Sequence, residues 1–424
     1  GPPAEDVNEG RLQRAQRLTS DPQPQPPLSG IRVIDVGTRI AAPFCAGLLG
    51  ELGAEVIKVE QPDGGDFMRT IGPFVETSEG PYSLFWAVEG RGRKGVTLDL
   101  RQAAGQDLFR RLAATADVIT ENFRPQTMEK WGIGPDDCDP RLVWARISVF
   151  GQDGPYSQRP GLDRQGIGYG GLLYLTGYPD RPPVRPGVTI SDYLTGVFAA
   201  EAVVAALYRR DRPDAAIKTG AVIDAPLYGA ALRVLEWTVA AYDRLGIVRQ
   251  REGNRVPGSA PLDNYPTKDG KYICIVAGSD ANFRRLCRAM GRPELADDPK
   301  WKTLKERGAR SDEINGLVAQ WTEGLTAAEI EAVCIREDVP VGTAYSAADI
   351  ATDPHIDARH DLITIDDPLA GPHRQQAPFP RLVGEPSREP SPAPRLGEHN
   401  DEVWRDVVGL NDDELARHRA AKVI

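Results

Sequence analysis

The sequence predicts an α/β protein built around a mainly parallel sheet, and three observations lead to this class. Short apolar runs typical of buried strands alternate with longer segments of helical periodicity. Glycine and proline residues separate these segments. The composition, with 41% hydrophobic and 26% charged residues, is that of a globular chain, and 424 residues are enough for two or three domains.

The first half of the chain supplies most of the alternating elements. IRVIDVG (31–37) is a short apolar run that ends in glycine, as expected of a buried strand. PFCAGLLGELG (43–53) has helical character and also ends at a glycine. Strands that are joined through helices pair in parallel. The other elements expected in this half are strands at 54–60, 95–100, 117–123 and 142–151 and a helix at 101–116.

The second half begins with a stretch that is dense in glycine and proline, residues 151–188. It is long for a plain connection, and such loops are often functional. The segment 191–210 that follows has the pattern of a helix with one apolar face. The remaining expected elements are a strand at 221–227, one long helix at 228–245, strands at 269–278 and 339–346, and a helical segment after the proline-rich stretch that starts at about 375.

Charge, cysteine content and hydropathy exclude several functional classes. The net charge of −10 provides no cationic surface for phosphates, so we expect no nucleic-acid partner. The five cysteines form no C-x-x-C pair and fit reduced thiols, which predicts a cytoplasmic protein. We find no apolar run of about 18 residues and no signal peptide, and therefore expect no membrane partner. Residues 1–27 are polar, end in DPQPQPP and are expected to form a flexible arm.

The string GIGYGG (166–171) matches the G-x-G-x-x-G pattern of dinucleotide-binding folds. An acidic residue, Asp192, also lies about twenty residues further on, as such folds require. The glycines should close a strand and open a helix, however, and here they follow SQRPGLDRQ, which is not strand-like. We therefore favour a flexible glycine loop over an oxidoreductase that uses a nicotinamide cofactor.

Basic residues gather in the N-terminal half, most densely in RGRK (91–94). Such a run is usually a solvated face, but arginine side chains also pair with the phosphates of a nucleotide or of coenzyme A. The residues alone leave both interpretations open. The same supply of cations extends to Lys58, Arg69, Arg124 and Lys130.

Asp192 lies in TISDYLTG, at the start of the predicted helix 191–210. From periodicity alone it is interpreted first as an N-cap, whose carboxylate accepts bonds from the free N–H groups of the first turn. The same position also has chemical value. A carboxylate at a helix N-terminus is expected to stay ionised and nucleophilic, with backbone donors close by for an oxyanion.

Seven stretches of the sequence, taken together, resemble the class III CoA-transferases, a group that includes formyl-CoA transferase, carnitine CoA-transferase and α-methylacyl-CoA racemase. The resemblance runs from Leu28 to the C-terminus. The stretches are LSGIRVIDVGTRIAAPFCAGLLGELGAEVIKVEQP, GRGRKGVTLDL, ADVITENFRPQTMEKWGIG, RLVWARISVFGQDGPY, SDYLTGVFAAEAVVAALYRR, PTKDGKYICI and LGEHNDEVW.

The resemblance implies that Asp192 matches the catalytic aspartate of the family. Its carboxylate would attack the thioester of a donor acyl-CoA to form a mixed anhydride, and CoA would return to give an aspartyl-CoA thioester. An acceptor carboxylate would then reverse these steps. This chemistry requires no metal and no permanently bound cofactor, since the coenzyme A thioester is itself a substrate.

Residue-by-residue matching also implies a binding site for coenzyme A. Ile40 and Gln61 depart from the pattern of formyl-CoA transferase, and Gly258-Ser259-Ala260-Pro261 replaces a glycine-only loop. These departures argue against formyl-CoA or oxalate as substrates. The implied CoA-binding residues are Arg39, Ile40, Gln61, Leu98, Arg101, Asn122, Phe123, Arg124, Lys130, Pro160, Leu162 and Asp163.

Two other activities remain as alternatives. The racemase branch pairs its aspartate with a histidine in a G-H-D string, where this chain has Gly161-Leu162-Asp163. Leucine cannot exchange a proton, and no histidine occurs before His355, so racemisation is not expected. A non-catalytic acyl-CoA-binding protein would keep the pocket without forming a covalent adduct.

The resemblance also implies the domain organisation. We expect a Rossmann-like large domain from 28–224, a smaller α/β domain at 225–345 and a segment, 346–424, that returns to the large domain. The family forms an interlocked homodimer, and we expect the same here. The sequence does not identify the acids, although Arg39, Arg69 and Arg124 would suit a dicarboxylate such as succinate or malate.

Overall fold

The computed structural model describes residues 25–385 and 389–424, so most of the predicted arm 1–27 lies outside the described residues. The chain forms two compact units. One comprises the described residues up to Leu172 together with Gly187–Glu236 and Arg359–Ile424, and the other comprises Leu173–Pro186 and Trp237–Ala358. The unit boundaries after 236 and 358 lie about a dozen residues beyond the predicted domain limits at 224 and 345.

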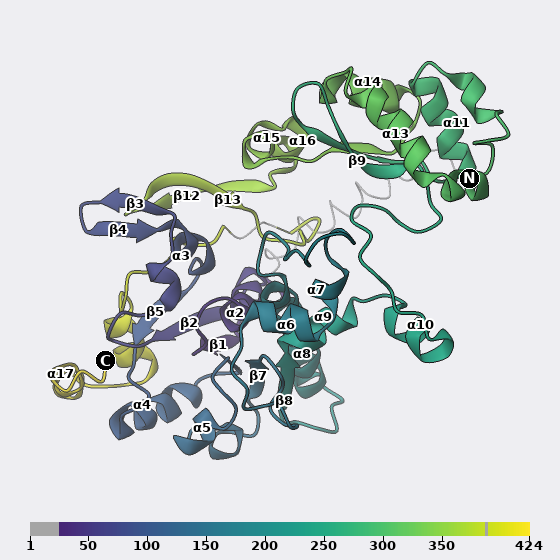
Figure 1. The fold of residues 1–424 in the computed structure, drawn as a ribbon. Helices are drawn as coiled ribbons and strands as arrows, with labels where there is room; N and C mark the ends of the chain where they lie inside the picture. Colours follow the sequence, from purple (N-terminus) through teal and green to yellow (C-terminus); the bar gives the residue numbers. More distant parts are fainter. Residues whose placement is uncertain (1–24, 386–388) are drawn as a thin grey trace. The chain divides into compact units, whose positions relative to one another are not determined.

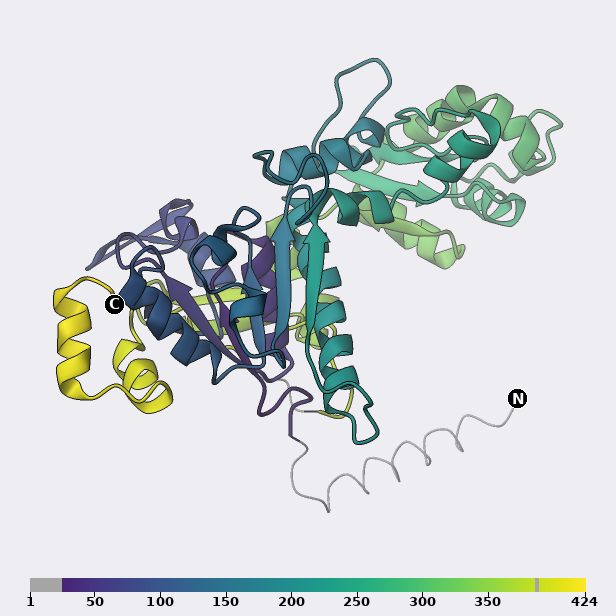
Figure 2. The same cartoon turned by 90° about the horizontal axis from the view of Figure 1, so that it is seen from below.

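A six-stranded parallel sheet forms the centre of the first unit, as the alternation of strands and helices predicted. Its strand order is β5-β2-β1-β6-β7-β8. The strands lie side by side in Figure 1 and are seen from another direction in Figure 2. Their bounds are β1 Arg32–Asp35, β2 Glu55–Glu60, β5 Lys94–Thr97, β6 Val118–Glu121, β7 Val143–Ser148 and β8 Ala221–Pro226.

Alternate residues of these strands build two separate cores. Val33 and Val56 pack with α2 (Ala41–Glu51) and α8 (Ile190–Asp211) on one face of the sheet. Their neighbours Ile34 and Ile57 pack on the other face with α4 (Ala103–Ala113) and the C-terminal segment. Because successive side chains of a strand point to opposite faces, a sheet covered on both sides needs continuous apolar runs. This explains the runs seen in the sequence.

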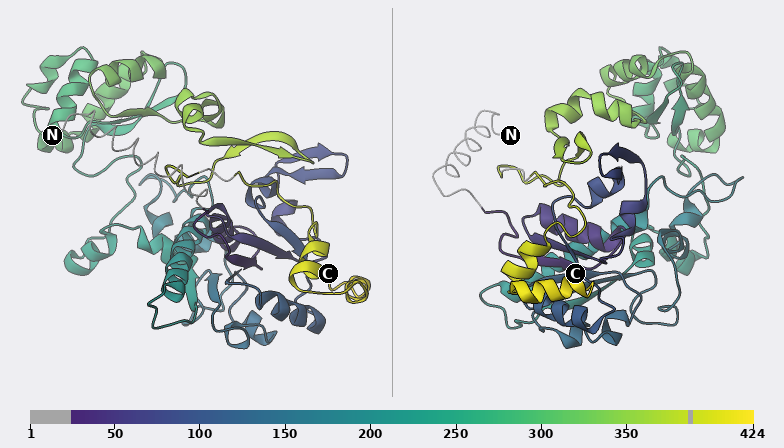
Figure 3. Two further views of the ribbon diagram at one scale, coloured as in Figure 1. Left: turned by 180° about the vertical axis from the view of Figure 1, so that it is seen from behind. Right: turned by 90° about the vertical axis from the view of Figure 1, so that its left-hand side faces the viewer.

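The C-terminal segment completes the second of these cores. A π-helix at Glu402–Val407 (η4) places the fully buried Trp404 against the residues of α4, and α17 (Asp412–Ala420) follows. Figure 3 shows this segment in yellow next to the sheet. The last residues of the chain therefore belong to the same unit as the first strands.

The second unit contains a three-stranded antiparallel sheet in the order β11-β10-β9. Ile273 and Ile275 of the central strand are completely buried against the helices of this unit. The strands are β9 Leu262–Pro266, β10 Tyr272–Val276 and β11 Val341–Thr343. The helices are α10 Thr238–Leu245, α11 Asp280–Ala289, η3 Pro293–Ala296, α12 Leu304–Ala309, α13 Ser311–Thr322, α14 Ala327–Arg336 and α15 Ala347–Thr352, followed by α16 Pro354–Arg359 at the unit boundary.

Two antiparallel hairpins in the first unit were not predicted. The strands β3 (Phe74–Thr77) and β4 (Gly80–Ser83) form one, and β12 (Leu362–Asp367) and β13 (Gly371–Gln376) form the other. The Tyr82 hydroxyl donates a hydrogen bond to the Asp367 carboxylate at 3.0 Å and links the two hairpins. Most of these strand residues are half-buried or exposed, so they lack the apolar runs from which the other strands were predicted.

The single long helix predicted at 228–245 is wrong, because the structure has two helices there. The first, α9, spans Leu227–Arg233, and α10 follows after a break at which Glu236 has a φ of 55°. A left-handed residue interrupts helical hydrogen bonding. The break coincides with the boundary between the two units, so the two helices pack in different surroundings.

The glycine-rich stretch after residue 151 is also more ordered than predicted. GIGYGG lies largely in α6 (Asp163–Tyr169), which α7 (Leu172–Leu175) follows, so the flexible glycine loop is wrong. A Cβ on Gly166 would lie 2.8 Å from the Leu227 Cβ and 2.9 Å from the Ser191 Oγ. The glycine is needed because α6 packs very closely on α8 and α9.

Helix α8 contradicts the expectation that no apolar segment is long enough to cross a membrane. Among the described helices it alone has this length and composition, with 22 residues and a mean hydropathy of 1.5. Its contacts are those of a core helix, however. Ala199, Val203 and Leu207 pack into the buried cluster between α2 and the central sheet.

We predict that Gly166→Ala destabilises the protein even though alanine is the better helix former. The new Cβ would meet Leu227 and Ser191 at less than contact distance, and overpacking of this kind costs about 1–3 kcal/mol. Gly316→Ala is the matched control, since this glycine is exposed within α13 and a Cβ there would meet nothing within 4 Å. Thermal unfolding should show a lower Tm for the first variant and an unchanged or higher Tm for the second. Equal upward shifts would contradict the packing argument.

Candidate active site

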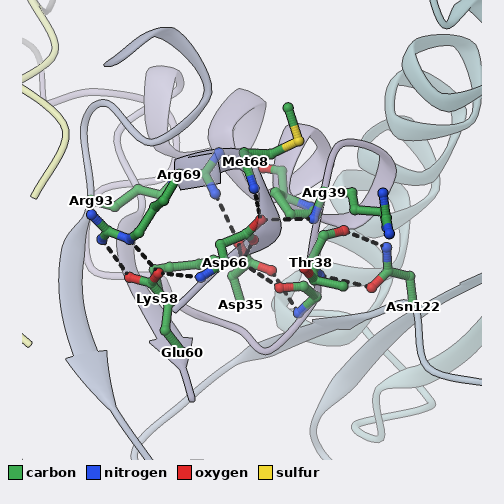
Figure 4. A network of polar contacts seen from close by, with 12 residues as sticks. Asp35, Thr38, Arg39, Lys58, Glu60, Asp66, Met68, Arg69, Arg93 and Asn122 are labelled. Atoms are coloured by element: carbon green, nitrogen blue, oxygen red, sulfur yellow. Dashed lines mark hydrogen bonds and ion pairs between the residues drawn. The ribbon is translucent and has the colours of Figure 1, made fainter. Parts of the chain in front are cut away.

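The loop that follows β1 is held by a buried network of charges (Figure 4). The Asp35 carboxylate accepts hydrogen bonds from the Gly37 N–H at 3.0 Å, the Thr120 hydroxyl at 3.1 Å and the Arg93 guanidinium at 2.8 Å. Asp35 and Arg93 are buried, and an unpaired charge in that position would be costly. The network therefore fixes where the chain leaves the carboxyl end of the sheet.

Lys58 of β2 is the cation at the centre of this network. Its ammonium group is fully buried and lies 3.3 Å from Asp35 and 3.1 Å from Asp66, and it also donates to the Gly37 carbonyl. Burial alone would lower the pKa of Lys58, but Asp35 and Asp66 raise that pKa above its usual value. The side chain stays charged and ties β1, β2 and the start of η1 (Phe67–Thr70) together.

Other cations that were considered for phosphate binding also form ion pairs within the fold. Arg69 forms hydrogen bonds to both oxygens of Glu60, at 2.7 and 2.8 Å, and its guanidinium lies 3.8 Å from the centroid of the Trp86 ring. Within RGRK, Arg91 pairs with Glu51 at 2.9 Å, and Lys94 pairs with Glu55 and Glu402. Because these side chains are paired with carboxylates of the protein, they form neither a solvated face nor an unoccupied site for phosphate.

Asn122 and Asp66 hold the next two residues of the loop. Asn122 accepts from the Thr38 N–H at 2.8 Å and donates to the Thr38 carbonyl at 2.7 Å. Asp66 accepts from the Arg39 N–H at 3.1 Å. Arg39 has a φ of 67°, and its guanidinium lies 3.9 Å from the centroid of the Phe67 ring. The backbone that carries Arg39 is thus held on both sides.

Asp192 lies inside the first turn of α8, and its interpretation as the N-cap is wrong because Thr189 occupies that position. Asp163 supports the turn by accepting from the Ser191 N–H at 2.9 Å and from the Ser191 hydroxyl at 2.8 Å. On the other side, the Tyr193 hydroxyl donates to Glu89 at 2.7 Å. Both neighbours of Asp192 are therefore anchored, and the site contains three carboxylates.

The surroundings of Asp192 change its protonation. Burial, followed by the charge of Asp163 and a contribution from Glu89, raises the pKa of Asp192 to about 7, whereas Arg39 acts in the opposite direction. At neutral pH this carboxyl group is therefore ionised in only part of the molecules, because burial disfavours its charged form. A partly buried carboxylate with such a shift is a candidate for chemistry.

A cavity of about 370 Å³ opens at the carboxyl ends of β1 and β2. It brings together four of the residues predicted to bind CoA, namely Gln61, Leu98, Arg101 and Phe123. Residues that sequence reasoning missed are Thr38, Asp63, Gly64, Gly65, Phe67 and Trp131. The one sequence signal for these residues was the pair Gly64-Gly65 after β2, because consecutive glycines indicate a tight turn. Both glycines adopt a positive φ in a turn at the edge of the cavity.

The remaining predicted CoA-binding residues lie elsewhere in the same unit. Ile40 is buried against Met68, Tyr82 and Trp86 instead of lining the cavity. Asn122 acts through its bonds to Thr38. Asp163 is buried beneath the Asp192 turn, and the side chains left at the surface are those of Arg124, Lys130, Pro160 and Leu162. Sequence reasoning also missed Glu89 and Tyr193.

Comparison with known proteins places these features in a family. Residues 28–400 match CoA-transferase family III. The chain is 40% identical to the succinyl-CoA–D-citramalate CoA-transferase of Chloroflexus aurantiacus, over 96% of this chain and 100% of that protein. It is 34% identical to the succinate–glutarate CoA-transferase of Agrobacterium fabrum, over 92% and 98% of the two chains.

A solved structure agrees with this result. The CAIB/BAIF family protein from Brucella suis superimposes with a TM-score of 0.81 at 32% identity, and the match covers 91% of this chain and all of that one. The resemblance found in the sequence is confirmed: the chain belongs to CoA-transferase family III.

Proposed function

We propose that this CoA-transferase moves CoA from an acyl-CoA donor to a carboxylic acid acceptor, reversibly, with Asp192 as the nucleophile. The observation that supports the proposal most directly is the Asp192 carboxylate itself. It is largely buried, its pKa is raised to about 7, and both its neighbours in α8 are anchored by hydrogen bonds. In the same unit, a cavity lined by Gln61 and Phe123 provides space for part of a CoA thioester.

The proposed sequence begins when an ionised Asp192 oxygen attacks the donor thioester carbonyl. The carbon–sulfur bond breaks, and an acyl-aspartyl anhydride and CoA thiolate form. The thiolate then attacks the Asp192 carbonyl, which releases the donor acid and leaves an aspartyl-CoA thioester. An acceptor carboxylate attacks this thioester, the carbon–sulfur bond breaks, and an anhydride between Asp192 and the acceptor forms with release of CoA thiolate. The thiolate then attacks the acceptor carbonyl of this anhydride, which gives the new acyl-CoA and frees the Asp192 carboxylate.

The environment of Asp192 suits such a nucleophile. A carboxylate is a weak nucleophile, and its ionised form becomes more reactive as its pKa increases. Burial provides most of this shift, and the charges of Asp163 and Glu89 add to it. The hydrogen bonds that Ser191 and Tyr193 donate to these two carboxylates limit motion of the turn. Close positioning of the two reactants lowers the entropic part of the barrier.

We further propose dicarboxylic acids as the acyl groups. Relatives from Chloroflexus aurantiacus at 40 and 41% identity are named for succinyl-CoA with D-citramalate and with L-malate. The departures at Ile40 and Gln61 already argued against formyl-CoA and oxalate.

An interlocked homodimer and a cytoplasmic location also stay part of the proposal. The family supports the homodimer. The cytoplasmic location is supported by the five cysteines, all of which lie in the described residues and form no disulfide there.

Asp192→Ala should abolish transfer and leave CoA binding nearly intact. Without the covalent route the rate should fall by about 10³-fold or more. Asp192→Asn is the isosteric companion and should behave alike, because an amide cannot form the anhydride. Transfer is measured by mass spectrometry of the acyl-CoA products, and CoA binding by calorimetry. A variant rate within tenfold of the wild type would remove Asp192 from the mechanism.

Incubation with donor acyl-CoA and no acceptor should trap an intermediate on Asp192. Hydroxylamine should convert the activated aspartyl group to a hydroxamate, and should do nothing without acyl-CoA. A cysteine thioester is the competing explanation, but Cys45 is fully buried and burial raises the pKa of its thiol strongly. Peptide mapping separates the two. Label on Cys45 or another cysteine, or no label at all, contradicts the proposal.

The first half-reaction should also depend on pH in a defined direction. Only ionised Asp192 attacks, and its pKa is raised to about 7, so kcat/KM for the donor should rise with pH through this value and then level off. Asp163→Asn keeps an acceptor for Ser191 but removes a negative charge that raises the pKa. The midpoint of its pH profile should lie lower than that of the wild type. An unchanged or higher midpoint would show that Asp163 does not tune this group.

A further inference from the structure

We propose that Arg39 binds the second, non-reacting carboxylate of a dicarboxylic acyl group and so determines the substrate class of the enzyme. The proposal rests on the function proposed above. It assigns to Arg39 contact with the acyl group instead of contact with CoA.

The backbone holds Arg39 in a fixed and unusual conformation. Its φ of 67° is one that L residues other than glycine rarely adopt, and it persists only where the surroundings enforce it. Here the Asp66 carboxylate accepts from the Arg39 N–H, and Asn122 holds the preceding residue with two bonds. Such strain is commonly found where a side chain must be aimed at a ligand.

The Arg39 guanidinium has no anionic partner of its own. Within residues 25–385 and 389–424 the guanidinium makes no hydrogen bond or ion pair, and the hydrogen bond of Arg39 to Asp66 comes from its backbone N–H. By contrast, Arg69 and Arg93 in the same network are paired with carboxylates. Arg39 instead lies over the Phe67 ring at 3.9 Å, a contact that orients a guanidinium and leaves its N–H edge free for a carboxylate.

The position of Arg39 places this cation at the acyl end of the reaction. It lies just before Ile40, the N-cap of α2, and the first turn of α2 faces the first turns of α8. The rings of Phe44 and Tyr193 touch there, with centroids 4.8 Å apart, and a Cβ on Gly196 would lie 3.0 Å from the Ala41 carbonyl oxygen. The charge of Arg39 acts on Asp192, but the two side chains form no ion pair in the described structure. Arg39 is therefore a cation that acts on the nucleophile and has no anionic partner among the described residues.

The chemistry of the reactants identifies that anion. The phosphates of a CoA thioester lie at the nucleotide end of the molecule, and its pantetheine arm is neutral. When the thioester carbonyl is at Asp192, the only remaining negative charge near it is a second carboxylate on the acyl group. The planar guanidinium matches a carboxylate in bidentate geometry. Arg69, the other half-buried candidate for this contact, is already paired with Glu60.

The test compares two donors that differ only at this group, succinyl-CoA and butyryl-CoA, whose methyl group replaces the distal carboxylate. The full-length wild type, Arg39→Met and Arg39→Lys are assayed for kcat/KM of the donor, which in a double-displacement reaction reports the first half-reaction alone. Arg39→Met should reduce the value for succinyl-CoA by about 30-fold or more, as expected for loss of a charged hydrogen-bonded contact. The value for butyryl-CoA should change by less than about fivefold, and Arg39→Lys should restore part of the succinyl-CoA activity.

Arg124→Met provides a control, because this exposed side chain is expected to serve CoA, which both donors share, and its loss should affect both donors by the same factor. If Arg39→Met lowers both donors equally, Arg39 acts on Asp192 or on CoA, and the proposal is wrong. It is equally wrong if neither donor is affected. Failure of the proposed function looks different, since the wild type itself would then transfer CoA from no donor.

Discussion

The buried ammonium group of Lys58 is the contact on which the arrangement of the site depends. It lies between Asp35 at the end of β1 and Asp66 before η1, and it also binds the Gly37 carbonyl. Because a buried charge without its partners costs several kcal/mol, these groups can be satisfied only together. The ends of two strands and a following loop are thereby brought to one place, and the same Asp66 then positions the Arg39 backbone.

This network also explains how charge is distributed around the candidate nucleophile. The cations of the sequence motifs, such as Arg93 and Lys58, neutralise carboxylates within the first unit. Asp192 lies near two further carboxylates and only one cation that lacks an anionic partner among the described residues, Arg39. Burial and charge together therefore favour a carboxylate that is protonated more readily than usual and is reactive once ionised.

Close packing of helices contributes as much as charge does. Gly166 and Gly170 allow α6 to approach α8 and α9, and this approach places Asp163 directly below Ser191. A string of glycines that resembles a dinucleotide motif thus serves packing. The string alone does not predict a packing role, because the same residues are compatible with a loop, a phosphate-binding site or a close contact between helices.

The sequence by itself determined the parallel sheet, the helices α2 and α8 and the candidacy of Asp192, since apolar periodicity and local motifs are properties of neighbouring residues. Only the tertiary structure decided the role of each charge. Arg93 meets Asp35 across 58 positions of the chain, and Asp163 meets Ser191 across 28. Whether a cation is buried, solvated or free for a substrate depends on such distant partners, and so does the pKa of Asp192. Local sequence does not specify these distances, because they arise only when the strands pair and the helices pack.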